Sequence, residues 1–214
     1  LARIVARTGF EAFRSLGFYF AVVLTGLAIH AFVNLPLLLM LVGRVNPLKH
    51  YRGMPSALMM AFSTCSTIVT LPLTLAAVTG NSRVSNKIAR FVLPIGATVN
   101  MDGAALYECV ATIFIAQVYG FELGFGAQIL IAFTALLASI GAASVPMSGM
   151  VMMSIILGAV GLPLEGVAII LAVDRILDMF RTTINVLSDS CGAVIIARLE
   201  GESLKGLGEP LDND

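Results

Sequence analysis

Five polar residues recur on one side of a predicted helix in the last quarter of the chain. They are Asp174, Asp178, Arg181, Asn185 and Asp189, spaced 4, 3, 4 and 4 residues apart. At about 100° per residue, this spacing places them within an arc of about 80° on a helix surface. The surrounding sequence is apolar, and a charged side chain at the centre of a membrane helix costs about 2.5 to 3.5 kcal/mol. The stripe is therefore expected to face partners, water or ions.

The charges of the stripe indicate which ligands it could bind. Arg181 can form two parallel hydrogen bonds with a carboxylate, and Asp178, about one turn away, can accept from an ammonium group. An amino acid with an acidic side chain would satisfy both residues. Three aspartates against one arginine also leave negative charge that a bound cation would neutralise. The plain alternative is that Asp178 and Arg181 only pair with each other and help to pack the helices.

A second polar segment, residues 94–103, interrupts an apolar run with a proline, two glycines, Thr98, Asn100 and Asp102. A helix that unwinds there exposes backbone carbonyl oxygens. These oxygens, the amide oxygen of Asn100 and the carboxylate of Asp102 are hard ligands, suited to Na⁺ rather than to zinc or copper. Taken alone, the Asn-Met-Asp-Gly sequence could also be a loop turn.

The composition places these residues in a membrane protein. Of the 214 residues, 58% are hydrophobic and 12% are charged, about half the charged fraction of a soluble domain. Thirteen Lys and Arg balance thirteen Asp and Glu, which argues against a nucleic-acid partner. The three cysteines are odd in number and lie far apart in apolar runs, which favours buried side chains over disulfides or zinc. Charge-free runs of 29, 29 and 42 residues, at 15–43, 54–82 and 123–164, exceed the roughly 20 residues that one spanning helix needs.

The run 54–82 is expected to form a re-entrant helical hairpin. The connectors on either side, 44–52 and 83–90, each carry three Lys or Arg residues and no acid, so both are expected in the cytoplasm. A run that enters and leaves on one side cannot hold two full spans in 29 residues. Its interior carries several hydroxyl groups and Pro72, where a helix break is expected.

The run 123–164 is expected to form a second hairpin, from the opposite side. It lies between Glu122 and Glu165 with no basic residue nearby, and its Gly-, Ser- and Pro-rich centre predicts a break, although 42 residues could also form two full spans. The other predicted segments are listed in chain order: residues 1–14 as the end of a preceding span and a connector, spanning helices at 15–43, 88–120 and 166–198, and a cytoplasmic tail at 199–214. The chain is expected to be the C-terminal portion of a longer protein.

Two hairpins that enter from opposite faces, each followed by a spanning helix, form an inverted repeat. This arrangement is typical of secondary transporters, in which the substrate site lies near the bilayer midplane where broken helices meet. The predicted fold is therefore an all-α membrane protein whose site lies between the two hairpin tips, the broken helix 88–120 and the polar stripe.

Three segments carry a resemblance to a known family. They are residues 100–108 (NMDGAALYE), 138–146 (ASIGAASVP) and 174–185 (DRILDMFRTTIN). Their sequences and their order resemble the signature segments of the glutamate transporter family, the dicarboxylate/amino acid:cation symporters, which includes the excitatory amino acid transporters. The resemblance covers nearly the whole chain. It implies a homotrimer in the plasma membrane, in which an elevator-type transport domain slides past a fixed scaffold and couples amino acid uptake to Na⁺.

The resemblance also assigns roles to individual residues. It implies that Asp178 binds the substrate ammonium and Arg181 the side-chain carboxylate, with further substrate contacts from Ser66, Thr67, Ser144, Val145, Pro146, Gly149, Asp174, Thr182 and Asn185. It also implies three Na⁺ sites. The first would use Gly96, Asn100, Asn185 and Asp189, and the second Thr98, Ser139, Ile140 and Ala142, largely through backbone oxygens. The third would use Asn100 and Asp102. Glu108 lies where animal glutamate transporters carry the acid tied to proton cotransport and K⁺ countertransport. A glutamate that only forms hydrogen bonds inside the bundle is equally compatible with the sequence.

Two positions bear on the class of substrate. Ala104 stands where acidic amino acid transporters usually have Thr and where neutral amino acid members have Ala, so a Na⁺-coupled neutral amino acid transporter is the alternative. Arg181 favours the acidic substrate, because a guanidinium in a dry pocket without an anionic partner would cost more than one missing hydroxyl. A passive channel lined by the stripe is a weaker rival. An intramembrane aspartyl protease is weaker still, because its Gly-x-Gly-Asp motif is absent, and no enzymatic activity is expected.

Overall fold

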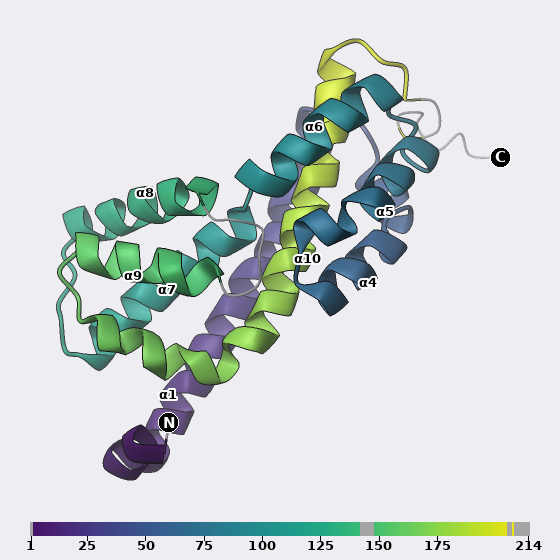
Figure 1. Cartoon of the computed structure of the whole chain (residues 1–214). Coiled ribbons are helices and arrows are strands. Elements are labelled where there is room, and N and C mark those ends of the chain that lie inside the picture. Colours follow the sequence, from purple (N-terminus) through teal and green to yellow (C-terminus); the bar gives the residue numbers. More distant parts are fainter. Residues whose placement is uncertain (1, 142–147, 205–206, 208–214) are drawn as a thin grey trace.

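The computed structural model describes residues 2–141, 148–204 and 207, with side chains for residues 14–141, 149–204 and 207. Every regular element in this part of the chain is helical (Figure 1), as the predicted all-α fold requires. The two longest helices, α1 (Ala2–Ile29) and α10 (Val167–Leu199), pack against each other along the length of the molecule. A π-helix, η1 (His30–Asn34), continues α1 into α2 (Leu35–Leu41), and the predicted boundary at residues 14 and 15 falls inside α1.

Two helices form a hairpin within the run 54–82. After the short connector helix α3 (Pro47–Arg52), α4 (Pro55–Thr64) packs against α5 (Thr67–Gly80). The turn is made by Cys65, in the left-handed conformation with φ of 52°, and by Ser66, whose Oγ accepts a hydrogen bond from Val69 N at 3.3 Å and so caps α5. Pro72, where the sequence predicts a break, lies inside α5 instead. The missing N–H of Pro72 removes only one hydrogen bond, and α5 continues through the proline. The turn of the hairpin is formed instead by Cys65 and Ser66.

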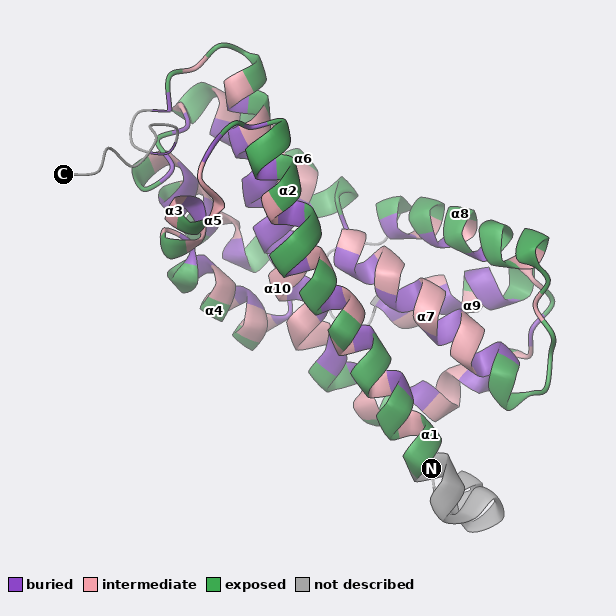
Figure 2. Ribbon diagram, turned by 180° about the vertical axis from the view of Figure 1, so that it is seen from behind, coloured by how far each residue is buried: buried purple, intermediate pink, exposed green. Residues whose placement is uncertain are grey.

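The run 88–120 is two helices, α6 (Asn86–Val99) and α7 (Asp102–Val118), separated by Asn100 and Met101. Pro94 lies inside α6, so the interruption falls six residues beyond the proline. A second pair of packed helices follows, α8 (Phe125–Gly141) and α9 (Ser148–Ala159), and the 3-10 turn η2 (Leu164–Gly166) leads into α10. The pairs α4–α5 and α8–α9 lie on opposite sides of α10 in both views (Figures 1 and 2).

The central position of α10 follows from how the apolar residues are buried. One buried cluster joins α10 to α4, α5 and α6, and another joins α10 to α1, α7 and α9. Large apolar side chains are also exposed, among them Phe18 and Phe32 of the helix α1–η1–α2 and Phe125 of α8. Figure 2 shows exposed positions along the outer faces of the helices. Two helical stretches, Arg14–Leu41 and Asn86–Val118, are long and apolar enough to cross a membrane. An apolar core inside an apolar exterior is the pattern of a chain that is surrounded by lipid.

Candidate functional site

The guanidinium of Arg181 lies at the centre of a buried polar cluster on α10. Its Nη2 donates to Asp178 Oδ1 at 2.9 Å and lies 3.6 Å from Asp174 Oδ1. Its Cζ lies 4.0 Å from the centre of the Tyr107 ring, which comes from α7, and the Tyr107 hydroxyl donates to Asp174 Oδ1 at 2.7 Å. The structure therefore brings together three residues of the predicted stripe and adds Tyr107, which the sequence reasoning did not assign.

Two nitrogen atoms of this guanidinium lack a partner. Arg181 is 3% exposed, and neither its Nε nor its Nη1 has a hydrogen-bond partner among the described residues. Gly149, at the start of α9, approaches so closely that a Cβ there would lie 2.7 Å from Nη1. An unsatisfied buried donor costs about 1 to 3 kcal/mol, and more when it is charged. A hydrogen-bond acceptor such as a carboxylate is the group that would satisfy these two nitrogen atoms.

Glu108 is a second buried group without a partner. It lies on α7, is fully buried, and neither of its carboxylate oxygens has a hydrogen-bond partner within the described parts of the chain. The hydroxyl of Thr112 donates to the backbone oxygen of Glu108 at 2.7 Å and leaves the carboxylate unbound. The alternative in which the Glu108 carboxylate only forms hydrogen bonds inside the bundle therefore finds no such bond in the described structure.

The interruption between α6 and α7 faces the second half of the stripe. Asn100 Nδ2 donates to Asp189 Oδ1 at 2.9 Å and to Ser188 Oγ at 3.1 Å. Gly96 lies beside them, and a Cβ at that position would be 2.6 Å from Asp189 Oδ1. A cavity of about 400 Å³ between α2, α6 and α10 is lined by Gly96, Asn100, Ser188 and Asp189 together with apolar side chains. Amide, hydroxyl and carboxylate oxygens around a cavity fit a hard cation.

Two more of the predicted residues, Asp102 and Asn185, meet at the start of α7. Asp102 is the first residue of α7, and Asn185 reaches it from α10. Asn185 Oδ1 accepts from Gly103 N at 2.8 Å, and a Cβ at Gly103 would lie 2.8 Å from the backbone oxygen of Arg181. Asp102 Oδ2 accepts from His30 Nε2 at 2.6 Å. His30 begins the π-helix η1, a feature that is frequent at functional sites. The sequence analysis missed His30, although a lone histidine inside the charge-free run 15–43 was a signal that could have identified it.

The hairpin α4–α5 brings Ser66 and Thr67 to the same region. Thr67 is buried, and its Oγ1 donates to the backbone oxygen of Ala97 in α6 at 2.7 Å. Ser66 is buried as well, and its hydroxyl also accepts from the backbone at the start of α5. The hairpin turn is therefore anchored next to the end of α6, three residues before Asn100.

Other predicted residues are more scattered. Thr98 is exposed, and its hydroxyl donates to the backbone of its own helix, at Ile95 O and Pro94 O. Ser139 is buried but donates to Leu136 O, and Ile140 is 43% exposed. Thr182 is buried directly after Arg181 on α10. The predicted contacts Ala142, Ser144, Val145 and Pro146 lie outside the described residues.

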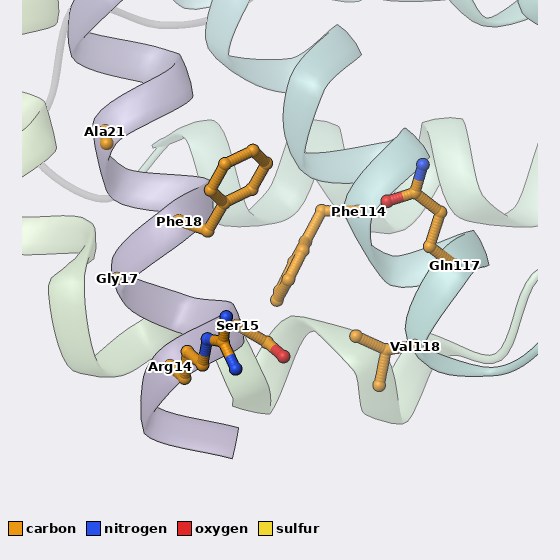
Figure 3. A pocket seen from close by; sticks show the side chains of 8 residues that line it. All are labelled: Arg14, Ser15, Gly17, Phe18, Ala21, Phe114, Gln117 and Val118. Atoms are coloured by element: carbon orange, nitrogen blue, oxygen red, sulfur yellow. The ribbon is translucent and has the colours of Figure 1, made fainter. Parts of the chain in front are cut away.

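A separate hollow of about 750 Å³ lies between α1 and α7, near the start of the apolar stretch of α1 (Figure 3). Phe18 and Phe114 face it, with Arg14 and Gln117 at its edges. None of the predicted substrate or ion residues lines it. The hollow therefore lies apart from the unpartnered polar atoms of Arg181 and Glu108.

Within the described residues, no group of three or more His, Cys, Asp or Glu side chains could hold a metal ion. The charged cluster is buried between helices whose outer surface is apolar, which defines the class: a helical membrane protein with a buried ionic cluster.

The chain belongs to the sodium:dicarboxylate symporter family, whose model matches residues 1–199. It is 51% identical over 203 residues to human excitatory amino acid transporter 3, 50% over 186 residues to mouse excitatory amino acid transporter 5, and 50% over 198 residues to human excitatory amino acid transporter 1. These alignments cover 95%, 87% and 92% of this chain, but only 39%, 33% and 36% of the relatives. The resemblance inferred from the three sequence segments is thereby confirmed at the level of the family.

Proposed function

We propose that this chain forms the substrate- and ion-binding part of a Na⁺-coupled symporter of acidic amino acids, glutamate or aspartate, that works by alternating access. The observation that carries the proposal is the buried guanidinium of Arg181, with two nitrogen atoms that lack partners in the described structure. Membership of a family named for sodium and dicarboxylates supports it, and so do relatives named excitatory amino acid transporters.

In the proposed binding mode, the side-chain carboxylate of the substrate binds at Nη1 of Arg181, beside the pairing that Asp178 makes with Nη2. Asp178 binds the ammonium group, because its side chain is more exposed than that of Asp174, 14% against 7%. Two carboxylates around one guanidinium leave the negative charge that an ammonium group would neutralise. The remaining proposed contacts are Ser66, Thr67, Ser144, Val145, Pro146, Gly149, Thr182 and Asn185.

Na⁺ is proposed to bind beside the interruption in the broken helix. Asn100 gives both its amide hydrogens to α10, so its amide oxygen is the atom that would coordinate a cation together with Asp189. The proposed ligands, in the three sites implied by the family resemblance, are Gly96, Asn100, Asn185 and Asp189; Thr98, Ser139, Ile140 and Ala142; and Asn100 with Asp102.

Glu108 is the proposed carrier of a coupled proton, with K⁺ countertransport as its complement. The unpartnered, fully buried carboxylate supports this role, because adding a proton removes a buried charge. Replacing Glu108→Gln should abolish pH-dependent net uptake while Na⁺-driven exchange of substrate persists. Loss of both activities together would contradict the role.

The wider architecture is part of the same proposal. The helix pairs α4–α5 and α8–α9 act as re-entrant hairpins of an elevator-type transport domain, in a homotrimer of the plasma membrane. The connectors 44–52 and 83–90 and the end of α10 face the cytoplasm, in agreement with their basic residues.

The proposal is tested by uptake of radiolabelled aspartate, glutamate and alanine into proteoliposomes that contain the full-length protein, with Na⁺ and K⁺ gradients imposed separately. Uptake should require Na⁺, saturate, and prefer the acidic substrates. Arg181→Cys should shift the preference towards alanine by at least a hundredfold, about 2.8 kcal/mol, whereas Arg175→Cys, at an exposed position on the same helix, should leave it unchanged. Unchanged aspartate affinity in Arg181→Cys would refute the role of the guanidinium.

Neutral amino acid transport is the second candidate, and Ala104 is the observation that favours it. Ala104 is buried beside Met101 and Met152, an apolar surround that offers no hydroxyl to an acidic substrate. Alanine uptake that exceeds aspartate uptake in the unmodified protein would select this candidate. Flux that does not saturate and does not depend on Na⁺ would instead favour a channel.

A further inference from the structure

His50 is a buried histidine that the proposed transport function does not use. It lies on the short connector helix α3 and is 0% exposed. Its two ring nitrogens reach two different segments of the chain. Nδ1 lies 2.8 Å from Oγ of Ser82, two residues after the end of α5, and Nε2 lies 2.9 Å from Ser190 Oγ on α10. We call these three residues the His50 clamp.

The hydrogen bonds of the His50 clamp fix the position of the ring proton. Ser190 Oγ donates to Leu187 O at 2.6 Å, so its hydroxyl hydrogen is already used and its oxygen must accept from Nε2–H. Nδ1 is then the acceptor, and the hydroxyl of Ser82 donates to it. A neutral imidazole with its proton on Nε2 satisfies both bonds. In a doubly protonated ring both nitrogens would donate, so the Ser82 hydroxyl would have to turn and accept from Nδ1.

The connector that carries His50 makes further contacts on both sides. Asn81 Nδ2 donates to Gly53 O at 2.7 Å, which closes the base of the hairpin α4–α5. The hydroxyl of Tyr51, next to His50, donates to Ala31 O in the π-helix η1 at 2.6 Å. Helix α3 therefore joins the base of the hairpin, the C-terminal third of α10 and the π-helix that carries His30.

Ser190 adjoins the proposed Na⁺ ligand Asp189. Successive residues on a helix point about 100° apart, so a small rotation of α10 moves Asp189 relative to Asn100. The space there is tight, because a Cβ at Gly96 would lie only 2.6 Å from Asp189 Oδ1. Fixing Ser190 thus fixes the distance between the two proposed cation ligands.

We propose that His50 is a positioning residue: through the His50 clamp it holds α10 against the base of the first hairpin, and so sets the affinity of the neighbouring cation site for Na⁺. The inference rests on the proposed function for its Na⁺ readout. The proposal does not place His50 in contact with Na⁺ or with the substrate.

The test compares His50→Phe, which keeps a planar ring but no hydrogen bonds, with Leu48→Ala, an exposed position on the same helix. In the full-length protein in proteoliposomes, His50→Phe should raise the Na⁺ concentration for half-maximal aspartate uptake about tenfold, while the maximal rate changes less than twofold. Ser190→Ala should give part of this shift alone and no additional shift in the His50→Phe background. His50→Gln, which keeps a donor and an acceptor, should restore part of the affinity. Leu48→Ala should match the unmodified protein.

A second readout separates the clamp from the transport proposal. Cys191 follows Ser190 and is 1% exposed. A small thiol reagent therefore labels it faster when α10 packs less tightly against its neighbours, and peptide mass spectrometry resolves this labelling. His50→Phe should speed this labelling about tenfold, even if the unmodified protein shows no Na⁺-dependent uptake. Unchanged Cys191 labelling in the folded variant, or an equal loss of maximal rate and Na⁺ affinity, would overturn the inference.

Discussion

Helix α10 carries two polar clusters of different character, about 12 Å apart along its axis. Around Arg181, two guanidinium nitrogens and, nearby on α7, both carboxylate oxygens of Glu108 have no partner among the described residues. Around Asp189 and Ser190, the side chains bond to Asn100 and His50, and no buried polar side-chain atom there lacks a partner in the described structure. Buried polar groups are almost always satisfied. The first cluster therefore has polar atoms available for a ligand, whereas the polar side chains of the second cluster already bond to one another.

The largest expected effect comes from removing the charge of the first cluster. Arg181→Met leaves Asp174 and Asp178 as buried carboxylates without a cation, so the free energy of unfolding should fall by about 3 to 5 kcal/mol. Denaturant unfolding of the purified protein measures this loss. Arg175→Met, exposed on the same helix, should change it by less than about 0.5 kcal/mol. Adding Asp178→Asn to Arg181→Met should recover part of the loss, and if it does not, the pairing contributes little.

The second cluster predicts a pH dependence. Burial lowers the pKa of His50 from its ordinary value of 6.5 to about 4. The unfolded chain therefore takes up a proton at His50 as the pH falls below 6.5, while the folded chain does so only near pH 4. The contribution of His50 to the free energy of unfolding should consequently drop by about 1.6 kcal/mol between pH 6.5 and pH 5. The difference in unfolding free energy between the unmodified protein and His50→Phe, measured at both pH values, isolates this change. A difference that stays constant would show that His50 is not buried as a neutral ring.

The sequence could predict the first cluster because its residues lie on one helix. A spacing of 4, 3, 4 and 4 needs only the helical period to bring Asp174, Asp178 and Arg181 together. Composition and charge-free runs were likewise sufficient for the all-α fold. The polar stripe and the helices depend on residues that lie within a few turns of each other, so a local sequence pattern is enough to predict them.

The contacts between distant segments could not be predicted in this way. His50 follows Lys49 in a basic connector and resembles a surface residue, yet its partner Ser190 lies 140 residues away. His30 and Asp102 are 72 residues apart. The break in the first hairpin was expected at Pro72 but falls at Cys65 and Ser66, because packing tolerates one lost hydrogen bond inside a helix. The break in the next span falls at Asn100 and Met101, within the predicted segment 94–103, although Pro94 itself lies inside α6.

A third prediction tests whether the second cluster also binds cations. Asp189→Asn keeps the shape of the side chain and removes its charge, so the Na⁺ concentration for half-maximal aspartate uptake should rise about tenfold, or 1.4 kcal/mol. A Na⁺ titration of uptake in proteoliposomes measures the change. Glu200→Gln, exposed just beyond the end of α10, is the control. An unaltered titration would leave the second cluster with a purely structural role.

The smallest effect is expected at Thr98, in the proposed Na⁺ site that relies mostly on backbone oxygens. The Thr98 hydroxyl donates to Ile95 O at 2.9 Å. Thr98→Val removes this hydroxyl but leaves in place the backbone oxygens that are proposed as the main ligands of this site. Half-maximal Na⁺ should change less than twofold, as it should for Thr183→Val, a threonine that makes the same kind of bond within α10. A tenfold change confined to Thr98→Val would identify its hydroxyl as a ligand. It would also weaken the contrast between the clusters, because a hydroxyl whose hydrogen is already bonded in the structure would then bind an ion through its oxygen lone pairs.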